Sequence, residues 1–129
     1  MKVLMLNGSP RKDGNTSIAV LDRLFYSSHF DKTMKVGVSV VCARRGGCSA
    51  TFDELNKYFT ISNMPIAPSQ YWNSIHGRAQ GEAEMDEEGK QTMRVLARNM
   101  VFLMKSIALG KEKFGLPETE ERVATHFIR

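Results

Sequence analysis

Residues 2–17 read KVLMLNGSPRKDGNTS, and the predicted fold starts from this pattern. It begins with four apolar residues at 3–6, which are too few for a helix and typical of a buried strand. The chain breakers NGSP occupy 7–10, and a helical apolar pattern starts at Ile18 behind three N-cap candidates. The predicted order is therefore strand, polar loop, helix.

This loop has the composition of a phosphate site. A loop that opens onto a helix N-terminus directs free backbone N–H groups and the positive end of the helix dipole at one point. Donors and positive charge are added there by Ser9, Arg11, Lys12, Asn15, Thr16 and Ser17. Neither a G-x-x-x-x-G-K-[ST] nor a G-x-G-x-x-G motif is present. The residues leave two interpretations, a phosphate-binding loop and an ordinary strand-to-helix turn with a good cap.

The pattern NGSPRxxGNT after an N-terminal strand closely resembles the flavodoxin-like NAD(P)H-dependent FMN reductases, a family that includes quinone-reductase-like flavoproteins. In that family this loop wraps the phosphate of FMN. The resemblance implies FMN as cofactor, NAD(P)H as co-substrate, and a flavin, quinone or other small molecule as electron acceptor. The phosphate contacts that it implies are Ser9, Arg11, Asn15, Thr16 and Ser17.

A second strand–loop–helix unit follows the first. Residues 34–42 are rich in valine and predict a central strand, which leads into a loop with two arginines and two glycines. In the resembling family the corresponding loop lies near the isoalloxazine ring. Glycines let backbone approach a flat ring, and arginines stabilise a negative reduced flavin or a nicotinamide phosphate. The second group of cofactor-binding candidates is therefore Arg44, Arg45, Gly46 and Gly47, with a solvated basic turn as the alternative.

Spacing predicts the helices. A first helix is expected at 17–25, and a second is expected to begin at the capping box formed by Thr51 and Glu54. The longest helix is expected at about 87–109, with the acidic segment 82–88 as the cap region at its N-terminal side and Gly110 as its end.

The remaining segments predict less regular structure. A third strand is expected at 64–73, at a sheet edge because it contains Pro65 and Pro68, followed by a long loop at 74–81. The charged tail at 116–129 is expected to be flexible or to dock on a partner.

Four side chains keep two interpretations each. Cys42 and Cys48 are either a redox pair or a buried strand-end residue and a helix-proximal thiol; the spacing, which is not C-x-x-C, favours the second. Trp72 and His76 either reach a flavin edge or substrate, or are a packed tryptophan and a solvated histidine. No triad, metal-ligand set or carboxylate pair is recognisable, so no catalytic residue and no metal site is predicted.

Composition describes a soluble globular chain of 129 residues, 42% hydrophobic and 25% charged. No apolar run approaches the ~20 residues of a membrane span, and no signal-peptide pattern is present, so we expect a cytoplasmic protein without membrane contact. The net charge of +4 favours anionic ligands through steering. Because the basic residues are scattered, nucleic-acid binding is not expected.

The order β-α-β-α-β-α predicts one α/β domain over 1–129 with a parallel sheet. The resemblance implies a shortened flavodoxin-like three-layer fold, because only about three of the five strands are recognisable and the middle of the domain is missing. The missing part includes the loop that in the family clamps one side of the flavin. A shortened sheet leaves strand edges unpaired and predicts a dimer.

Two functions follow from this pattern. The first is an FMN-dependent oxidoreductase. The alternative is an internally deleted, non-catalytic relative that keeps a phosphate- or FMN-binding loop and acts as a binding or assembly module.

Overall fold

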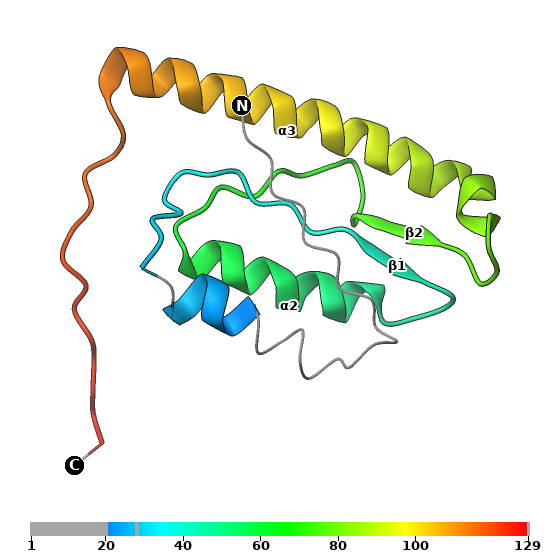
Figure 1. Cartoon of the computed structure of the whole chain (residues 1–129), viewed down its shortest axis with the longest axis horizontal. Helices are drawn as coiled ribbons and strands as arrows, with labels where there is room; N and C mark the ends of the chain where they lie inside the picture. The colour runs from blue at the N-terminus through cyan, green and yellow to red at the C-terminus, as the bar shows by residue number, and fades with distance from the viewer. Residues whose placement is uncertain (1–20, 28, 129) are drawn as a thin grey trace.

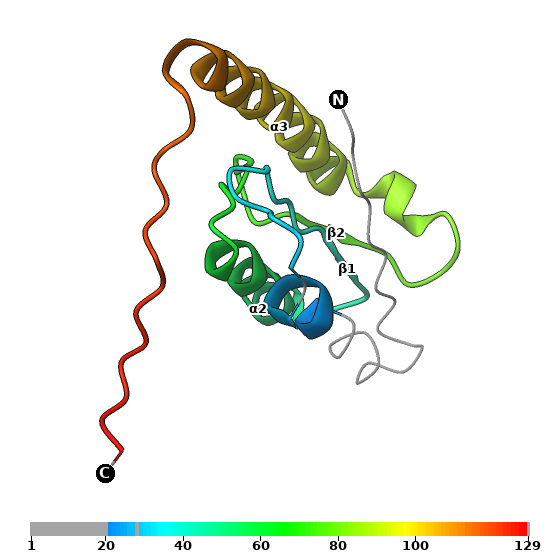
Figure 2. The ribbon, with the colours of Figure 1, turned by 60° about the vertical axis from the view of Figure 1, so that its left-hand side comes forward.

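The computed structural model describes residues 21–27 and 29–128. Its elements in chain order are η1 (Arg23–Ser27), β1 (Val41–Ala43), α2 (Cys48–Ile61), β2 (Ser74–His76), η2 (Glu82–Met85) and α3 (Glu87–Phe114). The strand pair lies between α2 and α3 in both views (Figures 1 and 2). The predicted mixture of helices with a parallel sheet is confirmed, and the sheet of the described residues has two strands. The strand predicted at 3–6 lies outside the described residues.

The strands β1 and β2 are parallel neighbours, with Val41 opposite Ser74 and Ala43 opposite His76. Parallel strands cannot be joined by a tight turn, and α2 lies on the connection between them. An isolated parallel bridge joins Gly37 to Ile66 upstream of this pair. The predicted strand at 34–42 is therefore confirmed only as this bridge and the short strand that follows it.

The predicted third strand is interrupted. Between the bridge and the strand pair, the first segment advances from Gly37 to Val41 while its partner advances from Ile66 to Ser74. The segment between Ile66 and Ser74 is longer than its partner and leaves the strand pairing in this interval. Pro68 lies in it and has no N–H to donate to a neighbouring strand. Regular pairing resumes only at β2, so the strand lies at Ser74–His76, which the sequence had predicted to be loop.

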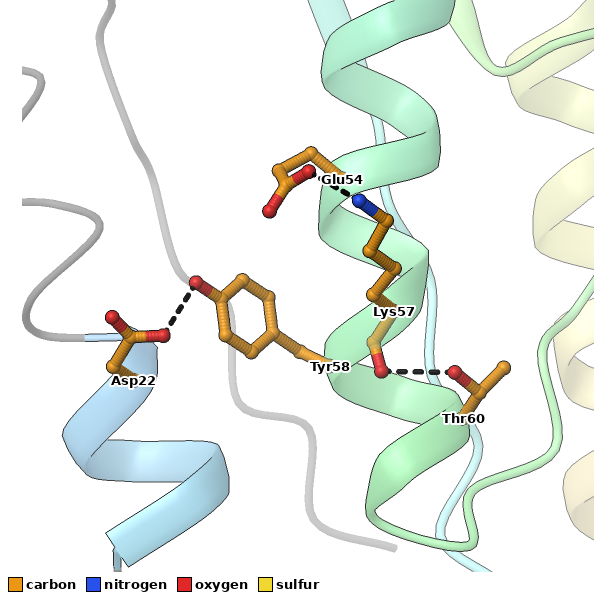
Figure 3. A network of polar contacts seen from close by, with 5 residues as sticks. All are labelled: Asp22, Glu54, Lys57, Tyr58 and Thr60. Atoms are coloured by element: carbon orange, nitrogen blue, oxygen red, sulfur yellow. Dashed lines mark hydrogen bonds and ion pairs between the residues drawn. The ribbon is translucent and has the colours of Figure 1, made fainter. Parts of the chain in front are cut away.

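The helix α2 begins at Cys48, three residues before the predicted capping box. Gly47 is its N-cap and has φ 93°, with no side-chain cap hydrogen bond. This left-handed conformation suits glycine and turns the chain from β1 into the helix early. Thr51 therefore lies inside the first turn, where its N–H donates to the Gly47 carbonyl at 3.1 Å. Glu54 pairs instead with Lys57 at 2.8 Å (Figure 3).

The segment around η1 packs on α2. Tyr58 donates its hydroxyl hydrogen to the Asp22 carboxylate at 2.8 Å, as Figure 3 shows. This hydrogen bond is the main cause that raises the pKa of Tyr58. The Phe25 ring lies 5.7 Å from the rings of both Tyr58 and Phe59, measured between centroids. The described part of the predicted first helix thus has a polar and an aromatic contact with α2.

The helix α3 is longer than predicted. Asp86 is its N-cap and accepts a hydrogen bond from the Gly89 N–H at 2.9 Å, in the acidic segment predicted to cap it. Gly110 does not end the helix, because glycine is tolerated in a helix interior at a cost of about 1 kcal/mol. The helix ends at Gly115. This residue has a φ of 79°, a backbone conformation that residues with a side chain rarely adopt. Residues 116–128 form no regular element and are exposed, with the tail running away from the strand pair (Figure 1).

The buried core of the described residues is small. Its buried apolar side chains are Val41, Cys48, Ala67 and Leu96. Large apolar side chains at Phe102, Leu109 and Phe114 are exposed on the second half of α3. Within the described ranges, no helix is long and apolar enough to cross a membrane.

Gly37 and Gly110 allow a matched test of the packing. A methyl group at Gly37 would lie 2.5 Å from Cγ of Phe59, so Gly37→Ala should destabilise the fold by roughly 1–3 kcal/mol. A methyl group at Gly110 would meet no atom within 4 Å, so Gly110→Ala should stabilise α3 by about 0.5–1 kcal/mol. Urea unfolding followed by circular dichroism measures both. Equal effects of the two substitutions would contradict the packing of Phe59 on the strand segment.

Candidate functional site

Two helix N-termini lie at one end of the strand pair. The chain leaves β1 at Ala43 and enters α2 at Cys48, and it leaves β2 at His76 before entering α3 at Glu87. Ala43 and His76 are register partners, so both loops start side by side. Figure 1 shows the beginnings of α2 and α3 at this same end. We call this end of the pair the carboxyl edge; ligands of parallel α/β proteins commonly bind at such an edge.

The loop predicted as the second cofactor contact is part of the carboxyl edge. Arg44, Arg45, Gly46 and Gly47 are all exposed and connect β1 to α2. A methyl group placed on Gly46 or on Gly47 would meet no atom within 4 Å. The backbone here is therefore open to a flat molecule, and two guanidinium groups lie in the same loop as the α2 N-terminus.

His76 connects the two helix starts. Its Nε2 atom lies 3.8 Å from the Sγ of Cys48, the first residue of α2. Its Nδ1 atom lies 3.8 Å from Oδ2 of Asp86, the N-cap of α3. The backbone N–H of His76 donates to the same Asp86 oxygen at 2.7 Å. The imidazole ring therefore lies between a thiol and a carboxylate.

The Asp86 carboxylate has two backbone donors. Hydrogen bonds from the N–H groups of Gly89 and His76 hold the pKa of this carboxyl below its usual range. A neighbouring carboxylate, Glu82, accepts from the N–H groups of Ala79 and Arg78, and these bonds likewise lower its pKa. The two carboxylates order the chain between β2 and α3 and are ionised at neutral pH.

Cys48 is buried, with 9% of its surface exposed, whereas Cys42 is exposed. Burial raises the pKa of the Cys48 thiol, and the charge of Cys42 adds to this shift. Both cysteines are free thiols. The prediction of a buried Cys42 is therefore wrong: as a residue of a short strand at the molecular surface, it has a side chain open to solvent. Cys48 is helix-proximal, as predicted.

Two small cavities are found, one at this edge and one away from it. One of about 50 Å³ is lined by Ser74, His76, Asp86, Gly89 and Thr92, among others. Another of about 160 Å³ lies between the end of α3 and the tail and is lined mainly by apolar groups. Pockets that enclose drug-sized ligands have volumes of roughly 300–1,000 Å³. The cavity beside His76 admits water-sized molecules, and a larger ligand would lie on the open loop.

The structure brings some of the predicted site residues together. Arg44, Arg45, Gly46 and Gly47 share the carboxyl edge with His76. Trp72 precedes β2 and is 54% exposed, with its ring 4.8 Å from Tyr71, so it is not a packed residue. The predicted phosphate contacts Ser9, Arg11, Asn15, Thr16 and Ser17 lie outside the described residues.

Sequence reasoning missed the group formed by Cys48, His76 and Asp86. Cys48 and His76 are 28 positions apart, and His76 and Asp86 are 10 apart. No spacing rule relates them, and parallel pairing of β1 and β2 is what brings them together. The usable signal was the place of each residue in the elements: Cys48 begins α2, His76 ends β2, and Asp86 caps α3. All three places lie at the carboxyl edge.

Asp86 should make stability depend on pH. A carboxyl whose pKa is depressed in the folded state stabilises it above the unfolded pKa of about 3.9. That contribution is lost as pH falls through the lower folded pKa. Asp86→Asn keeps an N-cap oxygen but removes the acceptor of the His76 N–H, so its urea midpoint should be lower than that of the unmodified chain at pH 7. The difference should shrink on acidification below about pH 4. Asp53→Asn on α2 is the control; a pH-independent difference for Asp86→Asn would contradict the role of its charge.

No protein-family model, curated protein or solved structure matches the chain. The properties of the carboxyl edge therefore rest on its own geometry.

Proposed function

We propose that the chain is a flavin-dependent oxidoreductase that uses NAD(P)H to reduce a flavin, a quinone or another small acceptor through FMN. The observation that carries this proposal is the open loop Arg44-Arg45-Gly46-Gly47 at the carboxyl edge. It combines backbone that lacks side-chain cover, two cationic groups and the N-terminus of α2.

Each part of this loop suits one part of such a ligand. Bare glycine backbone supports close approach of a planar ring, and guanidinium groups stabilise phosphate or a negative reduced ring. The phosphate of FMN is assigned to Ser9, Arg11, Asn15, Thr16 and Ser17 on the sequence pattern. FMN itself supplies the hydride and electron chemistry when bound, so the chain's residues need only bind and orient it.

A second candidate function is favoured by the small sheet. The described residues pair two strands and bury four apolar side chains, and the two cavities described above are smaller than a flavin. These features fit an internally deleted relative that retains phosphate or FMN binding without turnover. Such a chain would serve as a binding or assembly module, with unpaired strand edges available to a second copy in a dimer.

Titration with FMN distinguishes the two loops and tests the proposal. Arg44→Ala together with Arg45→Ala should weaken binding about tenfold or more, because charge-assisted hydrogen bonds each contribute about 1.5–3 kcal/mol. Ser9→Ala and Arg11→Ala should weaken it as well. Quenching of flavin fluorescence measures the dissociation constant. Arg98→Ala with Lys105→Ala, which removes the same charge from the exposed face of α3, is the matched control.

The outcome decides between the two candidate functions. Binding that is weakened by both sets of loop variants, accompanied by NAD(P)H oxidation, supports the oxidoreductase. Binding without oxidation supports the non-catalytic module. Absence of saturable binding would overturn FMN as the ligand, and an equal effect of the control pair would show that net charge alone acts.

A further inference from the structure

The group of Cys48, His76 and Asp86 has no role in the flavin chemistry proposed above. We propose that it is a thiol-oxidation site, at which hydrogen peroxide oxidises Cys48 to a sulfenic acid while His76 transfers the proton. This inference does not depend on FMN binding, because the FMN contacts proposed above include none of the three residues.

The three side chains are ordered as nucleophile, base and carboxylate. The Sγ of Cys48 lies 3.8 Å from one imidazole nitrogen of His76, and Oδ2 of Asp86 lies 3.8 Å from the other. The same Asp86 oxygen accepts the backbone N–H of His76 at 2.7 Å, which fixes the position of that residue. A base within reach of a thiol, oriented in turn by a third group, is the arrangement that activates nucleophilic cysteines.

The surroundings explain why Cys48 requires its base. Burial of the thiol disfavours its ionised form, so Cys48 rests as a neutral thiol. Transfer of its proton to His76 creates an imidazolium beside the Asp86 carboxylate and a thiolate at the first position of the 14-residue helix α2. The positive end of a helix dipole and a neighbouring imidazolium both stabilise a thiolate.

The burial of Cys48 selects the oxidant. Only 9% of the Cys48 surface is exposed, so an oxidant must be small to reach its sulfur. Hydrogen peroxide is little larger than water and fits such a site, whereas quinones and bulky alkyl hydroperoxides do not. Metal binding by these residues is not favoured, because the described residues contain no His, Cys, Asp and Glu group arranged to hold a metal ion.

The reaction balances with hydrogen peroxide as the only added reagent. The Cys48 proton moves to Nε2 of His76, and Sγ attacks one peroxide oxygen while the O–O bond breaks. Sulfur loses two electrons and the peroxide gains them. The leaving hydroxide takes the proton back from His76, so that Cys48 thiol and H₂O₂ give sulfenic acid and water.

The test follows capture of the sulfenic acid by dimedone in the full-length chain with Cys42→Ser, which leaves Cys48 as the only thiol. Mass spectrometry measures the rate and position of the adduct at neutral pH after addition of hydrogen peroxide. We expect a higher rate in the folded chain than in the same chain unfolded in urea. His76→Gln should lower the folded rate about tenfold or more, as loss of a general base does, and His29→Gln on an exposed loop should not change it.

Asp86 is a positioning residue in this scheme and has its own readout. Asp86→Asn should reduce the rate, and Asp86→Glu, which restores the charge, should recover part of it. Circular dichroism shows whether each variant is folded. A folded chain that reacts no faster than the unfolded one, or a folded His76→Gln variant with an unchanged rate, would overturn the proposal. A tert-butyl hydroperoxide rate equal to that of hydrogen peroxide would overturn the size selection.

Discussion

Parallel pairing of β1 with β2 fixes where the loops and helices that follow the two strands begin. Strands that run in the same direction require a crossover, and α2 lies in that connection. Both following loops then leave the sheet at one edge, where Ala43 and His76 are neighbours. The beginnings of α2 and α3 are placed together for the same reason. Among the described residues, the arginine–glycine loop at 44–47 and the group of Cys48, His76 and Asp86 therefore lie at this edge.

Asp86 couples this edge to the stability of the longest helix. One carboxylate caps α3 through Gly89, holds the backbone of His76 and lies near its imidazole ring. The position of the imidazole is therefore set by the same carboxylate that caps the helix: Oδ1 accepts the Gly89 N–H, and Oδ2 accepts the His76 N–H. A site built in this way needs few buried side chains, which suits a chain whose described core is small.

The carboxyl edge offers two environments of different size. The arginine–glycine loop is open, cationic and suited to a large planar anion on the surface. Directly after this loop, Cys48 is buried and can be reached only by a small molecule, whereas the neighbouring His76 side chain is about half exposed. Gly47 separates the two: its positive φ ends the exposed loop and turns the chain so that the next side chain, Cys48, is buried. The backbone conformation of Gly47 therefore separates the exposed loop from the buried Cys48 thiol.

Helix spacing, helix caps and loop composition could be predicted from the sequence, because each depends on residues that are close together in the chain. Apolar spacing predicted the long helix, the acidic segment 82–88 predicted a cap region that contains the N-cap Asp86, and glycine with arginine predicted the loop after β1. Tertiary structure decided where α2 begins, where α3 ends, and that β2 lies at Ser74–His76. It also decided that Cys48, His76 and Asp86 meet. Strand register and backbone angles control these outcomes, and both depend on contacts between segments far apart in the chain.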